Sequence, residues 1–325
     1  VYFLSANIKT SSNSTILKVR SIMHEIQKVI IGKEKIIAKT LLAIISKGHI
    51  LIEDIPGVGK TTLALAFSKA LSLNHNRMQF TPDVLPTDVT GFTIYNKTTG
   101  NFDYKPGVVM CNLLLADEIN RTSSKTQSAL LEIMEESKVT VDGITRELPK
   151  PFIVIATQNP IGSIGTQMLP ESQLDRFIIK LSMGYPDINS EINIIKSKQN
   201  NNPMSQVNSV LSTDDILYMQ QLADCVYIDD KVYLYIARLI EATRKHPLIK
   251  LGVSPRGTLA LTNMAKSTAL IRGRDYVIPD DVTYIFNDVV EHRILLNSKA
   301  RINDVTVKSV LAEIISNVPV PEINM

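Results

Sequence analysis

A glycine-containing loop followed at once by a lysine and two threonines is the feature of this sequence with the clearest chemistry. Glycines let backbone N–H groups turn toward a phosphate, and a helix that starts behind them adds a favourable dipole. In such a loop the lysine reaches the β- and γ-phosphates, and the next hydroxyl binds magnesium. The residues that predict this nucleotide site are Pro56, Gly57, Val58, Gly59, Lys60, Thr61 and Thr62, with Lys60 on the phosphates and Thr61 on Mg²⁺.

The residues on either side of the loop suit the strand and the helix that this mechanism requires. Residues 49–52 form a short apolar run typical of a buried strand, and from Lys60 onward apolar residues recur at helical spacing. The pattern G-x-x-x-x-G-K-[ST] is met except at its first position, where Asp54 stands in place of glycine. We therefore expect strand, phosphate loop and helix in this order. The alternative is a glycine-rich turn that only caps a helix.

Two carboxylates follow a second apolar run, and an amide follows a third. Residues 111–116 predict a buried strand that ends at Asp117 and Glu118. Because open α/β sheets bind ligands at the carboxyl ends of their strands, we expect Asp117 to hold magnesium through water and Glu118 to polarise the water that attacks the γ-phosphate. The run 152–158 leads to Asn159, which could orient that water or cap the following turn.

Two arginines are further candidates for contact with a nucleotide. Arg176 comes just before the last predicted core strand, residues 178–181. Arg256 follows Ser254 and Pro255, which suit an N-cap and a first helical position. A cation in the first turn opposes the helix dipole, and a nearby phosphate would remove that conflict. The alternatives are an exposed ion pair for Arg176 and an ordinary helix start for Arg256.

The pattern of apolar residues divides the chain into three regions. Residues 1–15 are polar and rich in Ser and Asn, so we expect a loose N-terminal arm. Residues 16–185 alternate helical and strand patterns, which predicts an α/β nucleotide-binding core. Residues 186–325 predict an α-helical lid domain. Within the core, two stretches at about 73–112 and about 138–148 contain strands of their own, and the second has an Asp-Gly pair that suits a type I′ turn.

Composition indicates an ordinary globular protein. The 325 residues leave room for about two domains, and the net charge of +3, from 35 basic and 32 acidic residues, argues against nucleic acid as a partner. Two cysteines are too few for a disulfide framework, which fits a reducing compartment, so we expect a cytoplasmic protein. No apolar run reaches membrane-spanning length, and the first four residues are too short for the core of a signal peptide.

Taken in order along the chain, these motifs resemble the AAA+ ATPases, and among them the MoxR family. The matching stretches extend over most of the chain, and they are GHILIEDIPGVGKTTLA, QFTPDVLPTDVTG, LLLADEINR, KTQSALLEIMEE, VIATQNP, LPESQLDRF and SPRG. The resemblance implies the P-loop NTPase fold, an α/β core with a five-stranded parallel sheet followed by an all-α lid domain. It also implies ATP and Mg²⁺ as cofactors, ATPase activity, and a homo-oligomeric ring, commonly a hexamer.

The resemblance assigns roles to single residues. Those that match the Walker B pair, sensor 1, the arginine finger and sensor 2 are, in this order, Asp117 with Glu118, Asn159, Arg176 and Arg256. Ile31 and Gly32 match the segment beside adenine, although Lys33 stands where the family usually has glutamine. The stretches at about 73–112 and 138–148 match the helix-two insert and the pre-sensor hairpin, which face the pore or the partner surface of the ring.

MoxR-like proteins resemble chaperones that activate or mature partner proteins. Their partners often contain a von Willebrand A domain, so a partner chain of this kind is expected. The other readings are a monomeric P-loop GTPase or kinase, a DNA-remodelling AAA+ motor and the ATPase subunit of a metal-chelatase-like complex. A GTPase would need Asn-Lys-x-Asp, and the nearest match, residues 96–99, lacks the aspartate. The even charge counts against a DNA motor, whereas only the identity of the partner would distinguish a chelatase subunit.

Overall fold

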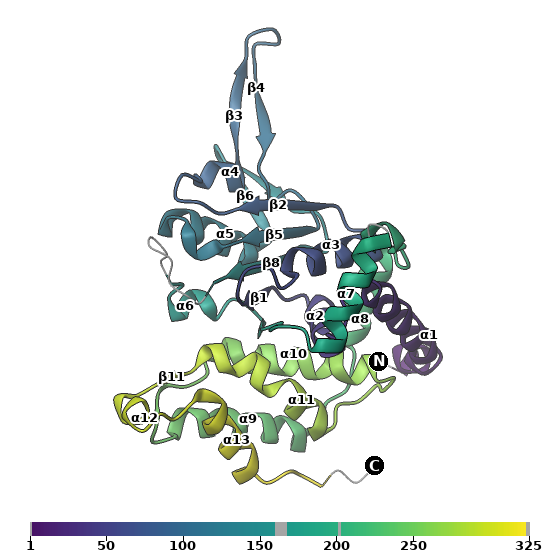
Figure 1. The fold of residues 1–325 in the computed structure, drawn as a ribbon, viewed down its shortest axis with the longest axis vertical. Coiled ribbons are helices and arrows are strands. Elements are labelled where there is room, and N and C mark those ends of the chain that lie inside the picture. Colours follow the sequence, from purple (N-terminus) through teal and green to yellow (C-terminus); the bar gives the residue numbers. More distant parts are fainter. Residues whose placement is uncertain (1, 160–167, 201–202, 323–325) are drawn as a thin grey trace.

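A five-stranded parallel sheet lies at the centre of the structure, a computed structural model that describes residues 2–159, 168–200 and 203–322, without the side chains of residues 2–13 and 198–200 (Figure 1). The strand order is β2-β5-β8-β1-β9, and all neighbouring pairs are parallel. Strands β5 and β8 are buried along their whole length, as expected of central strands covered on both faces. The predicted α/β fold with five parallel strands is confirmed. The strands are β1 (Ile50–Glu53), β2 (His75–Gln79), β5 (Leu113–Asp117), β8 (Ile153–Gln158) and β9 (Ile179–Leu181).

Alternate side chains of the strands enter two separate hydrophobic clusters. On one face Ile50 and Ile155 pack with the first three helices, α1 (Tyr2–Gln27), α2 (Glu34–Ile45) and α3 (Lys60–Ala70). On the other face Leu51 and Val154 pack with α5 (Ser124–Glu136). This alternation follows from the period of two in a strand, and it places the phosphate loop between a fixed strand and a fixed helix.

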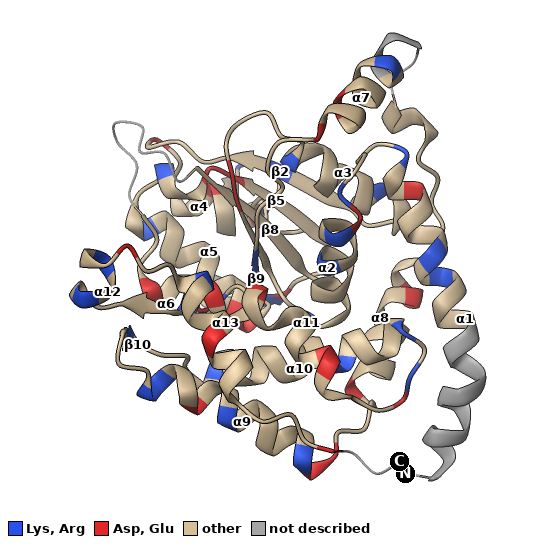
Figure 2. Ribbon diagram, turned by 60° about the horizontal axis from the view of Figure 1, so that its bottom comes forward, with Lys and Arg blue, Asp and Glu red and all other residues tan. Residues whose placement is uncertain are grey.

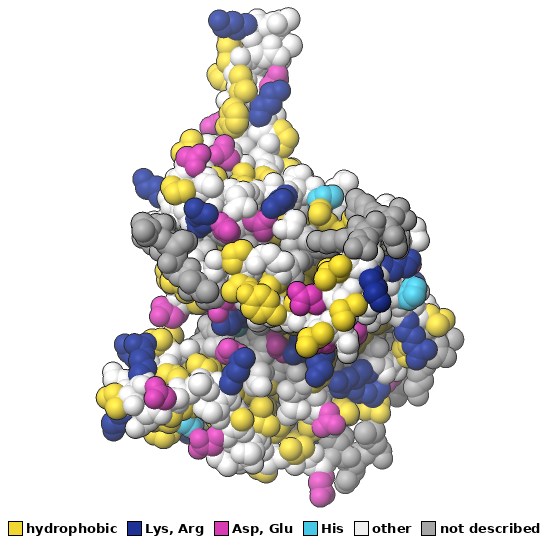
Figure 3. Space-filling model, viewed as in Figure 1, with side chains coloured by type: hydrophobic (Ala, Val, Ile, Leu, Met, Phe, Trp, Pro, Cys, Tyr) yellow, Lys and Arg dark blue, Asp and Glu magenta, His cyan; other side chains and the backbone are white. Residues whose placement is uncertain are grey.

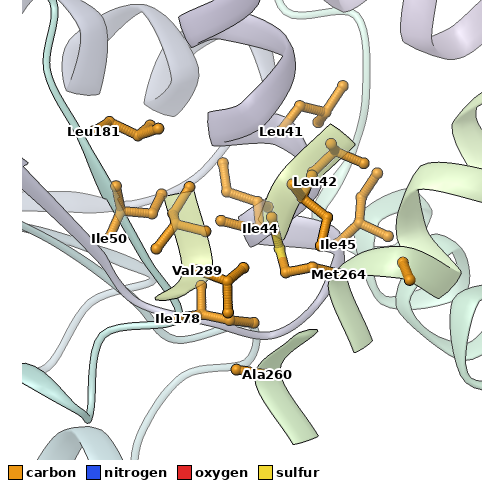
Figure 4. Close-up of a cluster of buried hydrophobic side chains, with 14 of the residues drawn as sticks. Leu41, Leu42, Ile44, Ile45, Ile50, Ile178, Leu181, Ala260, Met264 and Val289 are labelled. Atoms are coloured by element: carbon orange, nitrogen blue, oxygen red, sulfur yellow. The ribbon is translucent and has the colours of Figure 1, made fainter. Parts of the chain in front are cut away.

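The C-terminal region is helical, as predicted, and shares the first hydrophobic cluster. Figure 4 shows Met264 and Ala260 from α10 and Val289 from α11 packed against Ile44 of α2 and Ile178 beside the sheet. The helices of this region are α7 (Ile188–Asn200), α8 (Thr213–Asp224), α9 (Asp230–Lys245), α10 (Pro255–Ile271), α11 (Pro279–Val290), α12 (Ser298–Ile302) and α13 (Val307–Asn317). It also contains a short antiparallel pair, β10 (Ile249–Leu251) and β11 (Leu295–Leu296).

The prediction of a loose arm at residues 1–15 is wrong for the described backbone, because α1 begins at Tyr2. Two properties of the sequence account for this. No Gly or Pro occurs before Gly32, so nothing interrupts a helix. The helix is also nucleated further along, where Ile22 and Ile26 are fully buried, and extending an existing helix through weak formers such as Ser and Asn costs little per residue.

The insert is shorter than the predicted stretch of about 73–112, because β2 belongs to the central sheet. Strand β2 lies at the edge of the sheet, and its exposed and half-buried residues, His-Asn-Arg-Met-Gln, lack the apolar pattern of a core strand. The insert itself contains α4 (Pro86–Thr90) and a hairpin of β3 (Gly91–Asn96) and β4 (Asn101–Pro106). This hairpin projects far from the rest of the molecule (Figure 1).

A second hairpin, β6 (Lys138–Val141) and β7 (Ile144–Glu147), follows α5, as predicted. Its turn residues Asp142 and Gly143 have φ values of 51° and 75°, the backbone of the predicted type I′ turn. Acidic and basic residues are interspersed along the helices in Figure 2. Within the described ranges, no helix combines the length and the apolar character needed to cross a membrane.

Candidate active site

The phosphate loop connects the end of β1 to the start of α3. Gly57 and Gly59 have φ values of 85° and 97°, which glycine adopts without the steric cost that other residues bear. Gly59 precedes α3, and no side chain caps this helix, so its first N–H groups remain available to a ligand. A Cβ built on Gly57 would meet no atom within 4 Å, which means that the loop borders open space. Together with Lys60, this geometry fits a phosphate group.

Lys60 is folded back onto its own loop. Its Nζ donates hydrogen bonds to the carbonyl oxygens of Asp54 at 2.6 Å and Ile55 at 3.3 Å. Burial lowers the pKa of Lys60, and the carboxylates of Asp54, Asp117 and Glu118 act in the opposite direction. The ammonium group therefore lies within the electrostatic field of both Walker B carboxylates, so the structure brings these three predicted site residues together.

Asp117 and Glu118 stand at the end of β5 and are held by a neighbouring strand. Asp117 is 5% exposed, and its carboxylate accepts hydrogen bonds from Arg77 Nε at 2.7 Å and Thr157 Oγ1 at 3.2 Å. The same Thr157 hydroxyl accepts a hydrogen bond from the Glu118 N–H at 2.9 Å. Glu118 has a left-handed backbone with φ of 55°, and its carboxylate pairs with Arg121 at 2.8 Å. Thr157 thus positions both acidic residues.

Sequence reasoning missed Thr157 and Arg77 as parts of this site. Thr157 had a usable signal, because it is a polar residue that follows the apolar run of a buried strand and precedes Asn159. Arg77 had none, because its partner Asp117 lies 40 residues away along the chain.

Thr61 and Asp117 are the candidate protein ligands for magnesium. Thr61 is half-buried in the first turn of α3, and Thr62 follows it in the same turn. Among the described residues no group of three His, Cys, Asp or Glu side chains could hold a metal ion. Two oxygen donors suit Mg²⁺, since this ion is normally held by one or two protein groups together with substrate phosphates and water. The donor set therefore fits magnesium bound with a nucleotide.

Asn159 lies at the carboxyl end of β8, beside the Walker B strand. Its carbonyl oxygen accepts a hydrogen bond from Asn120 Nδ2 at 3.4 Å, which connects it to the turn after Glu118. This location suits the predicted role of orienting water, although its alternative role at the turn of Pro160 falls on a residue outside the described ones. Strands β5 and β8 are direct neighbours, so the two predicted catalytic segments end at the same edge of the sheet.

The segment predicted to lie beside adenine packs on the chain that leaves the core. Gly32 has φ of 71°, and a Cβ built on it would lie 2.1 Å from Ser190 Oγ at the start of α7. Ile31 is half-buried just before it. Lys33, which replaces the usual glutamine, donates a hydrogen bond from Nζ to the carbonyl oxygen of Tyr185 at 2.9 Å. We call residues 182–187, which connect β9 to α7, the exit segment.

Arg176 and Arg256 lie together but at a distance from the phosphate loop. Both form ion pairs with Glu135 at the end of α5, Arg176 at 3.3 Å and Arg256 at a close contact. Both arginines line a surface hollow of about 230 Å³ together with residues 46–49, which come just before β1. Lys60 comes after the end of β1, so the arginines and Lys60 lie at opposite ends of this strand. Without a bound nucleotide, Arg256 thus pairs with Glu135 away from the phosphate loop, and its expected contact with a phosphate stays a prediction.

A buried ion pair explains why the start of α10 lies at this end of the sheet. Arg293 is 5% exposed, and it donates hydrogen bonds to the Asp175 carboxylate at 2.7 Å and to the Phe177 carbonyl oxygen at 2.6 Å. The Ser254 hydroxyl donates to the other carboxylate oxygen of Asp175 at 2.7 Å. Two residues of the C-terminal region are thus fastened to the residue that precedes Arg176.

Comparison with known proteins relates this chain to a family of ATPases. Residues 49–179 match the model of the ATPase family associated with various cellular activities (AAA), and residues 241–314 match the AAA lid domain. Bacillus subtilis YeaC is 47% identical over 92% of this chain and 93% of its own length. The Mycobacterium tuberculosis chaperone MoxR1 is 40% identical over 93% and 82%.

A solved structure extends the agreement to the whole fold. The crystal structure of a candidate ATPase from Cytophaga hutchinsonii has a TM-score of 0.90 and 37% sequence identity, and the match covers 98% of each chain. The parallel sheet, the phosphate loop and the two carboxylates at the end of β5 define an AAA+ ATPase. Within that class, the chain belongs to the MoxR family.

Proposed function

We propose that this chain hydrolyses ATP at the interfaces of a homo-oligomeric ring, commonly a hexamer in the family, and uses the energy to remodel or activate a partner protein. The observation that carries the proposal is the separation of two sets of charged residues. One set lies at the carboxyl ends of the strands and consists of Lys60, Asp117 and Glu118. The other set lies near the amino ends of the strands and consists of Arg176 and Arg256. A single subunit would hold the phosphates without these arginines, so a neighbouring subunit would supply them.

Each residue of the phosphate site has a part in this reaction. The loop N–H groups and the Lys60 ammonium would bind the phosphates, which requires Lys60 to leave its loop carbonyls. Glu118, held by Thr157, would accept a proton from the attacking water, and Asn159 would orient that water. Magnesium held by Thr61 and Asp117 would neutralise phosphate charge when bound.

The arginines would stabilise the charge that develops on the γ-phosphate of the neighbouring subunit. In the isolated subunit their charge is balanced by Glu135, which is exposed and therefore easily exchanged for a stronger anion. Hydrolysis would then depend on assembly. Arg256 joins Arg176 in this role because the two side chains share one anionic partner.

Mixing two inactive variants tests this arrangement. Lys60→Ala should abolish ATP binding, Arg176→Ala should bind ATP without hydrolysing it, and Arg301→Ala, an exposed change on α12, should match wild type. In randomly mixed rings about one interface in four pairs an intact loop with an intact finger, so up to about a quarter of the activity should return. Full activity of Arg176→Ala alone, or no recovery in stably mixed rings, would refute action between subunits.

The partner surface would include the two hairpins, which are in contact with each other. The Arg146 guanidinium of β7 stacks over the Tyr104 ring of β4 at 3.9 Å. Hydrophobic side chains are exposed along the longer hairpin (Figure 3), among them Tyr95 at 53% and Phe102 at 73%. Such exposed apolar groups on a projecting element are typical of protein interaction sites.

The family resemblance suggests a partner with a von Willebrand A domain. The chaperone name of the Mycobacterium tuberculosis relative is consistent with work on another protein. The Glu118→Gln variant with ATP should retain a purified partner of this class on a column, and the additional change Phe102→Ser should weaken that retention. Equal retention without the exposed ring would show that the hairpin is not the contact.

A further inference from the structure

We propose that Asp54 is a positioning residue that couples the phosphate loop to the exit segment. Asp54 occupies the position at which the phosphate-loop pattern has glycine. Its side chain is buried, with the residue only 7% exposed, although a carboxylate is among the groups least often found inside a protein unless it is paired. The proposal rests on the proposed function, because it assumes that ATP binds at this loop.

The Asp54 carboxylate is shared between two segments that are far apart along the chain. One oxygen, Oδ2, accepts hydrogen bonds from the Met183 N–H at 2.5 Å, the Gly184 N–H at 2.7 Å and the Ser182 hydroxyl at 3.1 Å. The other oxygen, Oδ1, accepts from the Ile55 N–H at 2.9 Å. Charge-assisted bonds of this kind are stronger than neutral ones, and a glycine at this position could make none of them.

The backbone of the same residue is held by the lysine that binds phosphate. Lys60 Nζ donates to the Asp54 carbonyl oxygen, so Asp54 connects Lys60 to the exit segment through one residue. When the γ-phosphate draws Lys60 away, the peptide group of Asp54 loses this partner and can reorient. The carboxylate would carry that change to the exit segment.

The exit segment is built to respond to such a change. Gly184 has φ of 59°, and a Cβ built on it would meet no atom within 4 Å. On this side of Gly184, neighbouring atoms therefore leave the backbone room to move. Lys33 beside the adenine segment holds the carbonyl oxygen of Tyr185. One segment is expected to touch the phosphates of a nucleotide and the other to touch its base. Both are therefore hydrogen-bonded to the exit segment.

Coupling also explains why a carboxylate, rather than any polar group, stands here. Three donors converge on a single oxygen, and a neutral amide oxygen carries less negative charge to hold them than a carboxylate oxygen does. Asp54→Asn keeps the size of the side chain but weakens the connection, and Asp54→Gly restores the usual phosphate-loop sequence while removing it. If Asp54 had no role of its own and was only tolerated at this position, Asp54→Gly should be at least as active as wild type.

The test compares these two variants with wild type in three measurements: the Kd of a non-hydrolysable ATP analogue, kcat for ATP, and amide hydrogen exchange at Met183 and Gly184 with and without the analogue. In wild type, exchange at these amides should change when the analogue binds. In both variants Kd should stay within about threefold while kcat falls about tenfold, since small errors in the placement of reacting groups are costly, and the exchange response should be lost.

The matched control is Asp187→Asn, which changes an exposed carboxylate of the exit segment that does not touch the phosphate loop. Asp187 accepts a hydrogen bond from the Ser190 N–H at 2.8 Å, and asparagine caps a helix equally well. This variant should match wild type in all three measurements.

Three results would overturn the proposal: wild-type kcat in Asp54→Gly, a wild-type exchange response in either Asp54 variant, or failure of both variants to fold, which would make Asp54 a structural residue. If wild type itself does not bind the analogue, the proposed ATPase function fails instead.

Discussion

Acid should destabilise this fold through His49, a buried residue immediately before β1. Its Nδ1 accepts a hydrogen bond from the Val154 N–H at 3.0 Å, and its Nε2 donates to the Met134 carbonyl oxygen at 2.9 Å. These two partners require the neutral imidazole with its proton on Nε2. A second proton on Nδ1 would face the Val154 N–H. Burial lowers the pKa of His49 to about 4 from 6.5, and the hydrogen bond to Met134 opposes this shift only in part.

The size of the effect follows from the two pKa values. The unfolded chain binds a proton at His49 more readily than the folded chain does. The contribution of neutral His49 to the stability of the fold is therefore complete above pH 6.5 and is lost as the pH falls toward 4. Between pH 7 and pH 5 this linkage amounts to about 2 kcal/mol of unfolding free energy, and below pH 4 to about 3 kcal/mol.

Urea unfolding of wild type and His49→Gln at pH 7 and pH 5 measures this contribution. Wild type should lose about 2 kcal/mol more than the variant, which has no titrating group at this position. His292 is also buried with its pKa lowered well below the ordinary value, mainly by burial, and it contributes equally to both proteins. The exposed change His24→Gln should match wild type. An equal pH dependence of His49→Gln and wild type would refute the argument.

Two further changes should have large and separate effects. Glu118→Gln should bind ATP but hydrolyse it at least about tenfold slower, or about 1.4 kcal/mol in the barrier, because the amide keeps the shape and loses the proton acceptor; turnover at the wild-type rate would assign the base elsewhere. Arg293→Met should lower the thermal midpoint by leaving the Asp175 carboxylate without its buried partner, at a cost of about 3–5 kcal/mol, and an unchanged midpoint would contradict the role of this ion pair.

Features that depend on neighbours along the chain could be predicted from the sequence. The phosphate loop, the strands before it and before Asp117, and the Asp142-Gly143 turn each carry their signal within a few residues, because glycine conformations and apolar runs act locally. The edge strand β2 was missed as a part of the sheet, since one exposed face and polar residues hide its pattern.

Features that depend on contacts between distant residues could not be predicted. The helix that carries Arg256 was correctly identified, but nothing in its spacing says at which end of the sheet it docks. That location is set by the bonds of Ser254 and Arg293 to Asp175, across 79 and 118 residues of chain. For the same reason the sequence shows that Asp54 departs from the motif but not which backbone groups its carboxylate meets.

The attachment of Asp175 to the C-terminal region has a consequence for how a ring would switch on. Arg176 follows Asp175 directly, and Arg256 lies two residues after Ser254, so the hydrogen bond between Ser254 and Asp175 holds the two arginines close to each other. A neighbouring site would receive both cations or neither, in a single docking event. Each interface would then have two states, a closed state that hydrolyses ATP and an open state that does not. A loosely associated pair of subunits would therefore not hydrolyse ATP.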